Sequence, residues 1–122
     1  MRKTLSLAVV LCLAFGLVPA PANAAACSVA DTESIRSLLV PITRLSAHQG
    51  RNADEIKEVL IEISKITKAT KSTKLRKSLK ALEGVIRDGE LNPGSTEFWG
   101  YREGSAWKTY KQALTPTQKN RC

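Results

Sequence analysis

Residues 52–70, NADEIKEVLIEISKITKAT, decide the fold class of this chain. Their large aliphatic residues recur at intervals of three and four, the period that places side chains on one face of an α-helix. Asn52 followed by Glu55 is typical of a helix N-terminus with a capping box. The stretch therefore predicts an amphipathic helix, whose apolar face consists of Ile56, Val59, Leu60, Ile63 and Ile66.

The segment before this helix has the same period, with a proline inside it. Asp31 or Thr32 can cap a helix that ends near Gly50. Pro41 lacks an N–H and its ring clashes with the preceding turn, so we expect a kink there or two short helices meeting at Val40. The apolar face of this segment consists of Ile35, Leu38, Leu39, Ile42 and Leu45.

Two more helices are expected after residue 70. The first begins at Ser72 or Thr73 and ends at Asp88, and its short connection predicts an antiparallel pair with the helix before it. The second is capped by Ser105 and ends before Pro116. No stretch alternates with period two, so the sequence predicts an all-α fold, a small bundle of about four short helices.

The N-terminal residues have the pattern of a secretory signal peptide. Arg2 and Lys3 precede an apolar run, and the small residues that follow it favour cleavage after Ala24. We therefore expect residues 1–24 to be a signal peptide, residues 25–122 to be one helical domain, and the protein to be exported, either secreted or periplasmic. The alternative is a lipoprotein in which Cys27 carries the lipid.

Removal of the signal peptide would leave two cysteines, Cys27 and Cys122. In an oxidising compartment we expect them to form one disulfide that ties the termini together. Closing a loop of nearly the whole domain would stabilise it by roughly 4 to 5 kcal/mol in the chain-entropy picture. Intermolecular pairing through Cys122 is the alternative.

Charge favours an anionic partner surface. The formal charge of +8, from 19 basic and 11 acidic residues, falls to +6 without Arg2 and Lys3. Seven of the basic residues lie close together with no acidic residue between the first and the last. We interpret them as a positive tip on the antiparallel helix pair and a candidate anion-binding site, the alternative being a merely solvated helix end; they are Lys65, Lys68, Lys71, Lys74, Arg76, Lys77 and Lys80.

The aromatic residues of the predicted domain all lie in residues 98–110, FWGYREGSAWKTY. Trp107 and Tyr110 share the apolar face of the last predicted helix and are expected in the core. The residues before them are flanked by Gly100 and Gly104, and aromatic residues beside an arginine are common at the centres of protein interfaces. Our candidate partner-binding residues are therefore Phe98, Trp99, Tyr101, Arg102 and Glu103, with core packing as the alternative.

The sequence shows no catalytic motif, and we expect no enzyme, no metal site and no cofactor. His48 is the only histidine, and we expect it to bond carbonyl groups at a helix end rather than a metal. The lysine-rich tract lacks interleaved aromatic residues, and the chain has no nucleic-acid motif. The sequence leaves the oligomeric state open.

These observations favour an exported, non-catalytic binding protein. Its partner is expected to be another protein, in an inhibitor or immunity-type role, or an anionic polymer or lipid surface of the cell envelope. A cationic membrane-active or antimicrobial protein is the alternative, since lysines and tryptophans suit that function as well.

Overall fold

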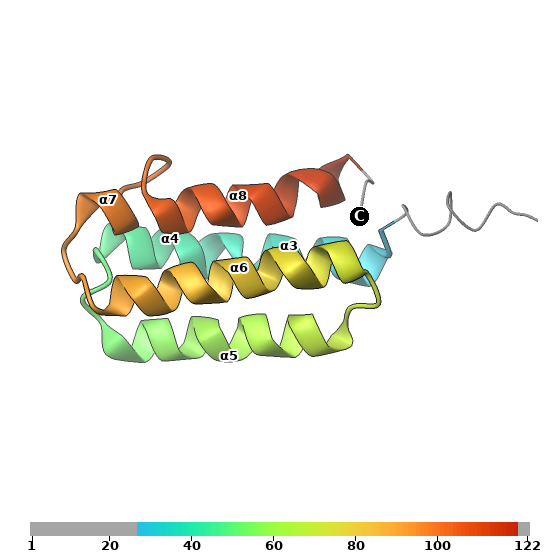
Figure 1. Ribbon diagram of the computed structural model, residues 1–122, viewed down its shortest axis with the longest axis horizontal. Helices are drawn as coiled ribbons and strands as arrows, with labels where there is room; N and C mark the ends of the chain where they lie inside the picture. Colours follow the sequence, from blue (N-terminus) through green and yellow to red (C-terminus); the bar gives the residue numbers. More distant parts are fainter. Residues whose placement is uncertain (1–26, 120–122) are drawn as a thin grey trace, which may run out of the picture.

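The computed structural model describes residues 27–119, and these residues form helices and connections without a strand (Figure 1). The prediction of an all-helical fold is confirmed for this part of the chain. The predicted signal peptide and Cys122 lie outside the described residues. In chain order the helices are α3 (Val29–Ser37), α4 (Leu39–Ala47), α5 (Ala53–Ala69), α6 (Thr73–Glu90), α7 (Thr96–Trp99) and α8 (Ser105–Gln118).

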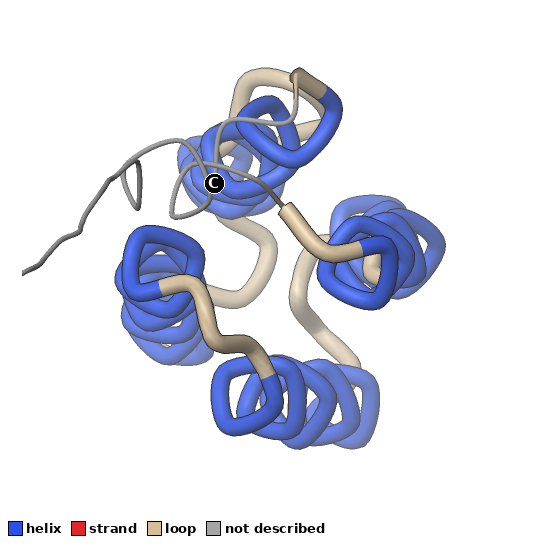
Figure 2. The backbone as a smooth tube through the Cα atoms, turned by 90° about the vertical axis from the view of Figure 1, so that its right-hand side faces the viewer, coloured by secondary structure: helices blue, strands red, loops and turns tan. Residues whose placement is uncertain are grey.

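The long helices lie side by side along one axis and surround a common interior (Figures 1 and 2). Helices α3 and α4 follow each other along one side, and α5 and α6 form the expected antiparallel pair (Figure 1). All five aliphatic residues of the predicted α5 face are buried. On the predicted face of the first segment, Leu39 is an exception, since it is 39% exposed. The interior is therefore a single core of aliphatic side chains, closed by Trp99 and Tyr110.

The break in the first helical segment lies at Leu38, and the prediction of a junction at Val40 is wrong by two residues. The N–H of Leu38 donates to Ile35 O, and the N–H of Ile42 donates to Leu38 O to begin α4. Pro41 thus falls in the first turn of α4, where a backbone N–H would have no helical partner. The proline sets where the new helix can begin rather than kinking an existing one.

Polar side chains cap the N-termini of most of the described helices. Asn52 Oδ1 accepts from the N–H groups of Asp54 and Glu55, and Ser72 Oγ accepts from the N–H of Leu75. The first helix is capped by Ser28, not by Asp31 or Thr32, since Ser28 Oγ accepts from the N–H of Asp31. These side chains satisfy donors that every helix leaves unpaired at its N-terminus.

Helix α8 differs from its prediction at both ends. It begins at Ser105 after Gly104, with no side-chain cap, and it continues through Pro116 to Gln118. The hydroxyl of Thr117 donates to Leu114 O at 2.6 Å, and the Thr117 side chain is buried. Packing of this last turn outweighs the preference of the residue before proline for extended backbone.

Trp99 occupies a slot between two glycines. A Cβ atom on Gly50 or Gly89 would overlap the indole ring, and on Gly89 it would lie 2.5 Å from Cζ2. The indole Nε1 donates to Gly89 O at 3.2 Å, so the buried polar atom of the ring is paired. Gly50 also has a φ of 65°, which glycine adopts without strain.

The Trp99 slot predicts opposite effects for two glycine-to-alanine substitutions in α6. Gly89→Ala places a methyl group against the Trp99 ring, and overpacking of this kind costs about 1 to 3 kcal/mol of unfolding free energy. Gly84→Ala meets no atom within 4 Å and should stabilise the helix by about 0.5 to 1 kcal/mol. Urea unfolding followed by circular dichroism measures both, and midpoints that move in the same direction would contradict the packing described here.

Tyr110 gives a second test, based on pH. Its hydroxyl donates to Ile35 O at 2.8 Å, at the break between α3 and α4, and its side chain is fully buried. Burial raises the pKa of Tyr110 to about 12, although the positive charge of Arg36 acts in the opposite direction. Because an unfolded tyrosine ionises near pH 10, the contribution of this group is complete below about pH 10 and is lost as pH rises toward 12.

We therefore expect the stability of the protein to fall more steeply between pH 10 and 12 than that of Tyr110→Phe. At neutral pH the variant should be less stable by about 1 kcal/mol, the net value of one hydrogen bond, since Ile35 O keeps the bond from the Leu38 N–H. The difference should shrink as pH rises. A difference that stays constant from pH 7 to 12 in chemical denaturation experiments would show that Tyr110 is not the group responsible.

Candidate binding surface

The segment from Gly100 to Gly104 is a tight turn that joins α7 to α8. The N–H of Gly104 donates to Gly100 O at 2.8 Å, and a Cβ on Gly104 would lie 2.7 Å from Phe98 O. Only a residue without a side chain allows the two arms of the turn to approach so closely. The three residues between the glycines, Tyr101, Arg102 and Glu103, are exposed.

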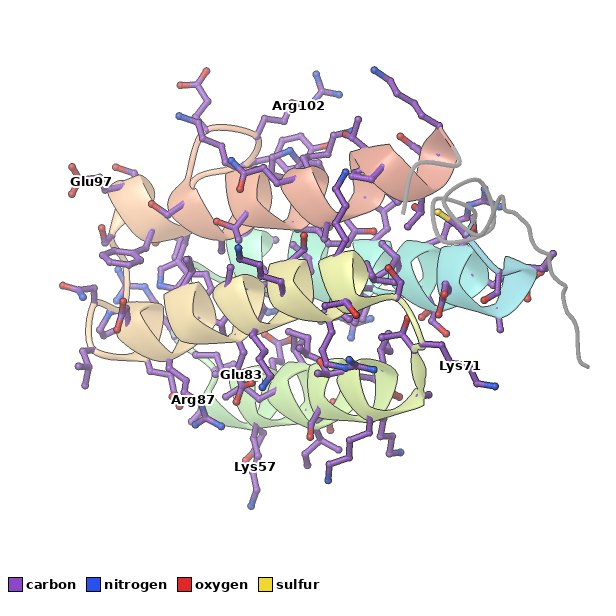
Figure 3. All side chains as sticks on the ribbon, turned by 45° about the vertical axis from the view of Figure 1, so that its right-hand side comes forward. Lys57, Lys71, Glu83, Arg87, Glu97 and Arg102 are labelled. Atoms are coloured by element: carbon purple, nitrogen blue, oxygen red, sulfur yellow. The ribbon has the colours of Figure 1, made fainter. Side chains whose placement is uncertain are left out.

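Arg102 has a φ of 69°, in the left-handed region that non-glycine residues seldom adopt. The surrounding turn imposes this conformation, and such backbone costs of order 1 kcal/mol or more. The Arg102 side chain extends over the Tyr101 ring, with Cζ 5.3 Å from the ring centroid. Figure 3 shows Arg102 projecting outward beside α8.

The aromatic rings form a series from the surface to the core. The centroids of Tyr101 and Trp107 are 4.9 Å apart with planes inclined at 54°, and those of Trp107 and Tyr110 are 5.9 Å apart at 57°. Tilted rings at these separations attract each other. The buried Tyr110 thereby supports the half-buried Trp107, which in turn supports the exposed Tyr101.

The five candidate partner-binding residues divide between surface and core. Tyr101 is 53% exposed, and Arg102 and Glu103 are exposed beside it. Phe98 is half-buried against the core. Trp99 is only 1% exposed, so it is not part of a contact surface; the two glycines around it leave room for the ring inside the protein.

The neighbouring part of α8 was not among the residues predicted for the site. Trp107, Lys108, Lys111 and Gln112 line a cleft of about 550 Å³ together with Arg102. Trp107 was expected in the core, but it lies at the edge of the apolar face and is half-buried. The spacing of Trp107 and Lys111, four residues apart on one helix, is the signal that places them side by side.

Six of the seven candidate anion-binding residues are lysines around the α5–α6 connection. Lys65 and Lys68 are on the last turns of α5, Lys71 is on the connection, and Lys74, Lys77 and Lys80 are on α6. All six lysines are exposed. In Figure 3, Lys71 and Glu97 lie at opposite ends of the molecule. We refer to these six lysines as the basic end.

Arg76 has a structural role instead. Its guanidinium donates to Thr70 O at 2.6 Å and to Thr67 O at 3.3 Å, both at the C-terminus of α5. These carbonyls have no partner within the helix, and a cation is favourable at this end of the helix dipole. Arg76 therefore holds the α5–α6 connection together and is half-buried rather than directed outward.

His48 forms a side-chain pair that the sequence did not predict. Its Nδ1 lies 2.8 and 2.9 Å from the two carboxylate oxygens of Glu55, joining the end of α4 to the first turn of α5. The predictions for both residues are therefore wrong. His48 bonds a carboxylate and not the carbonyl groups of a helix end. The Glu55 side chain faces His48 and does not complete a capping box with Asn52. Within residues 27–119, no three His, Cys, Asp or Glu side chains gather as metal ligands would.

Cys27 lies beside the last turn of α8. Its Sγ is 3.8 Å from Pro116 O, across 89 residues of sequence. Cys122, its predicted partner, is outside the described residues. The structure therefore places Cys27 beside the last turn of α8, and its pairing with Cys122 stays a prediction.

Comparisons of the chain with protein-family models, with curated proteins and with solved structures find no match. In the part of the chain that the structure describes, the helices are too short or too polar to cross a membrane.

Proposed function

We propose that this chain is an exported, non-catalytic binding protein that recognises another protein, in an inhibitor or immunity-type role. Its contact surface is the turn between α7 and α8, centred on Tyr101, Arg102 and Glu103. The observation that carries this proposal is a rigid turn that presents an aromatic ring and a guanidinium to solvent despite the strained backbone of Arg102. Tyrosine, tryptophan and arginine are the residues that dominate binding energy at protein interfaces.

Hydrogen bonds hold the turn between α7 and α8 in one conformation, which favours a recognition surface over a merely solvated loop. The Gly104 to Gly100 hydrogen bond and the Ser105 hydroxyl, which donates to Glu97 O at 3.2 Å, fix both arms. A surface that is ordered before binding loses little conformational entropy when a partner arrives.

The proposal includes export and a closed helical bundle. Residues 1–24 would be removed as a signal peptide, and Cys27 would pair with Cys122 to tie the termini of a four-helix bundle whose first helix is divided into α3 and α4. The position of Cys27 beside Pro116 supports this pairing, because only five residues separate Pro116 from Cys122. An intact mass under non-reducing conditions should match residues 25–122 less two hydrogens, and a disulfide-linked dimer or an uncleaved chain would contradict it.

A second candidate is an anionic component of the envelope, bound at the basic end. Six exposed lysines on α5, α6 and their connection favour it, since clustered charge attracts polyanions and acidic lipid headgroups. The membrane-active alternative is less well supported. Its apolar helix faces would have to leave the core, and all five of the aliphatic residues on the α5 face are buried there. Dye release from anionic vesicles, persisting in moderate salt, would favour it nevertheless.

The experiment that tests the leading proposal uses the mature protein as bait in extracts and medium of its producer. We compare three proteins: wild type, the double variant Tyr101→Ala, Arg102→Ala, and the double variant Lys65→Gln, Lys68→Gln. A stoichiometric protein partner should be retained by wild type and the lysine variant and lost from the Tyr101, Arg102 variant. Losing two interface anchors costs on the order of 2 kcal/mol or more each, enough to abolish capture of a micromolar partner.

The lysine variant is the control for net charge, since both of its positions are exposed on α5, away from the turn. Retention of lipid or polyanion alone, equal in wild type and the Tyr101, Arg102 variant and reversed by salt, would overturn the proposal. The basic end would then become the working surface.

A further inference from the structure

The cleft on α8 beside the proposed contact turn is lined by three cations, one aromatic ring and one amide: Arg102, Lys108, Lys111, Trp107 and Gln112. We propose that this cleft receives an acidic segment of the partner protein that also carries a flat apolar side chain. The inference rests on the proposed function, because it names the chemistry of the partner at the same site.

The first reason for this inference is that the positive charges of the cleft have no negative partner within residues 27–119. No carboxylate lines the cleft, and Arg102, Lys108 and Lys111 form no ion pair with the described residues. By contrast, Arg87 on α6 pairs with Glu83 at 2.9 Å. Lys108 and Lys111 are also three residues apart on one helix, a like-charge spacing that weakens the helix slightly. Carboxylates of a partner would relieve this repulsion, and complementary charge would guide its approach.

Trp107 supplies the apolar part of the cleft. Its ring is held between Tyr101 at 4.9 Å and Tyr110 at 5.9 Å, and it is only half-buried. A fixed ring with an accessible part can pack against an apolar side chain at little cost in rotamer entropy. Gln112 adds an amide that can both donate and accept, which suits a peptide backbone.

The composition of the cleft favours a peptide segment over a phosphate polymer. A uniform polyanion is attracted mainly by the number of cations, and the basic end offers six exposed lysines against three cations here. The cleft instead combines few charges with an aromatic ring and an amide, the mixture found at protein interfaces. Figure 3 shows Arg102 and Lys71 on separate parts of the molecule, so the two surfaces can be tested separately.

The test is a heteronuclear NMR titration of the oxidised protein with a blocked peptide of sequence EEFEE. The peptide KKFKK and a short polyphosphate serve as comparison probes. We expect EEFEE to shift the backbone amide signals of residues 101–112 and KKFKK to leave them unchanged. The double variant Lys108→Gln, Lys111→Gln should bind EEFEE about fivefold more weakly, the size expected for the loss of two exposed charge pairs.

The matched control is Lys65→Gln, Lys68→Gln. It removes the same charge at the same three-residue spacing, from exposed positions on α5, and should change EEFEE affinity by less than about twofold. Equal weakening in both variants, shifts confined to residues 65–80, or no shifts at millimolar peptide would each overturn the inference. So would a polyphosphate that binds residues 101–112 more tightly than EEFEE does.

This test can fail while the proposed function stands. A partner that is captured through Tyr101 and Arg102 but carries no acidic segment at the cleft would remove only the inference. Failure of capture itself would remove the proposed function, whatever the peptide does.

Discussion

The placement of Trp99 in its slot is the constraint on which the rest of the structure depends. Its ring fits against Gly50 and Gly89, its Nε1 donates to Gly89 O, and its carbonyl accepts from the Ser46 hydroxyl at 2.5 Å. One residue thus joins the end of α4, the turn before α5 and the end of α6. Full burial of a large aromatic ring contributes several kcal/mol, a large part of the net stability of a domain of this size.

The candidate site depends on the same residue. Trp99 ends α7, and Gly100 follows it at once, so the buried ring fixes where the turn to α8 begins. From the other side, Tyr110 anchors α8 by its bond to Ile35 O and supports Trp107. The exposed residues of the turn therefore rest on two buried aromatic residues, one at each side. A surface supported in this way keeps its geometry without a partner, which favours binding without rearrangement.

Sequence periodicity predicted the long helices and the buried face of α5, but not every helix end or the burial of Trp99. The stripe on α5 predicts its buried residues because each of them contacts the interior through the same repeating geometry. Trp99 has no such pattern, and its burial depends on two glycines 49 and 10 residues earlier in the chain, Gly50 and Gly89. Likewise, the partner of Glu55 depends on how α4 meets α5, because local capping and the more distant His48 compete for one carboxylate. Contacts of this kind are tertiary and leave no local signal.

Charge is distributed so that the two candidate surfaces need not compete. The six lysines of the basic end lie on the second half of α5, the first half of α6 and their connection, whereas the turn with Arg102 joins α7 to α8. Figure 1 places the α5–α6 connection and α7 at opposite ends of the molecule. An anionic surface that attracts the basic end would therefore orient the protein with α7 away from it. Adhesion through the lysines would then leave the turn accessible, so that an envelope polymer and a protein partner can be bound at the same time.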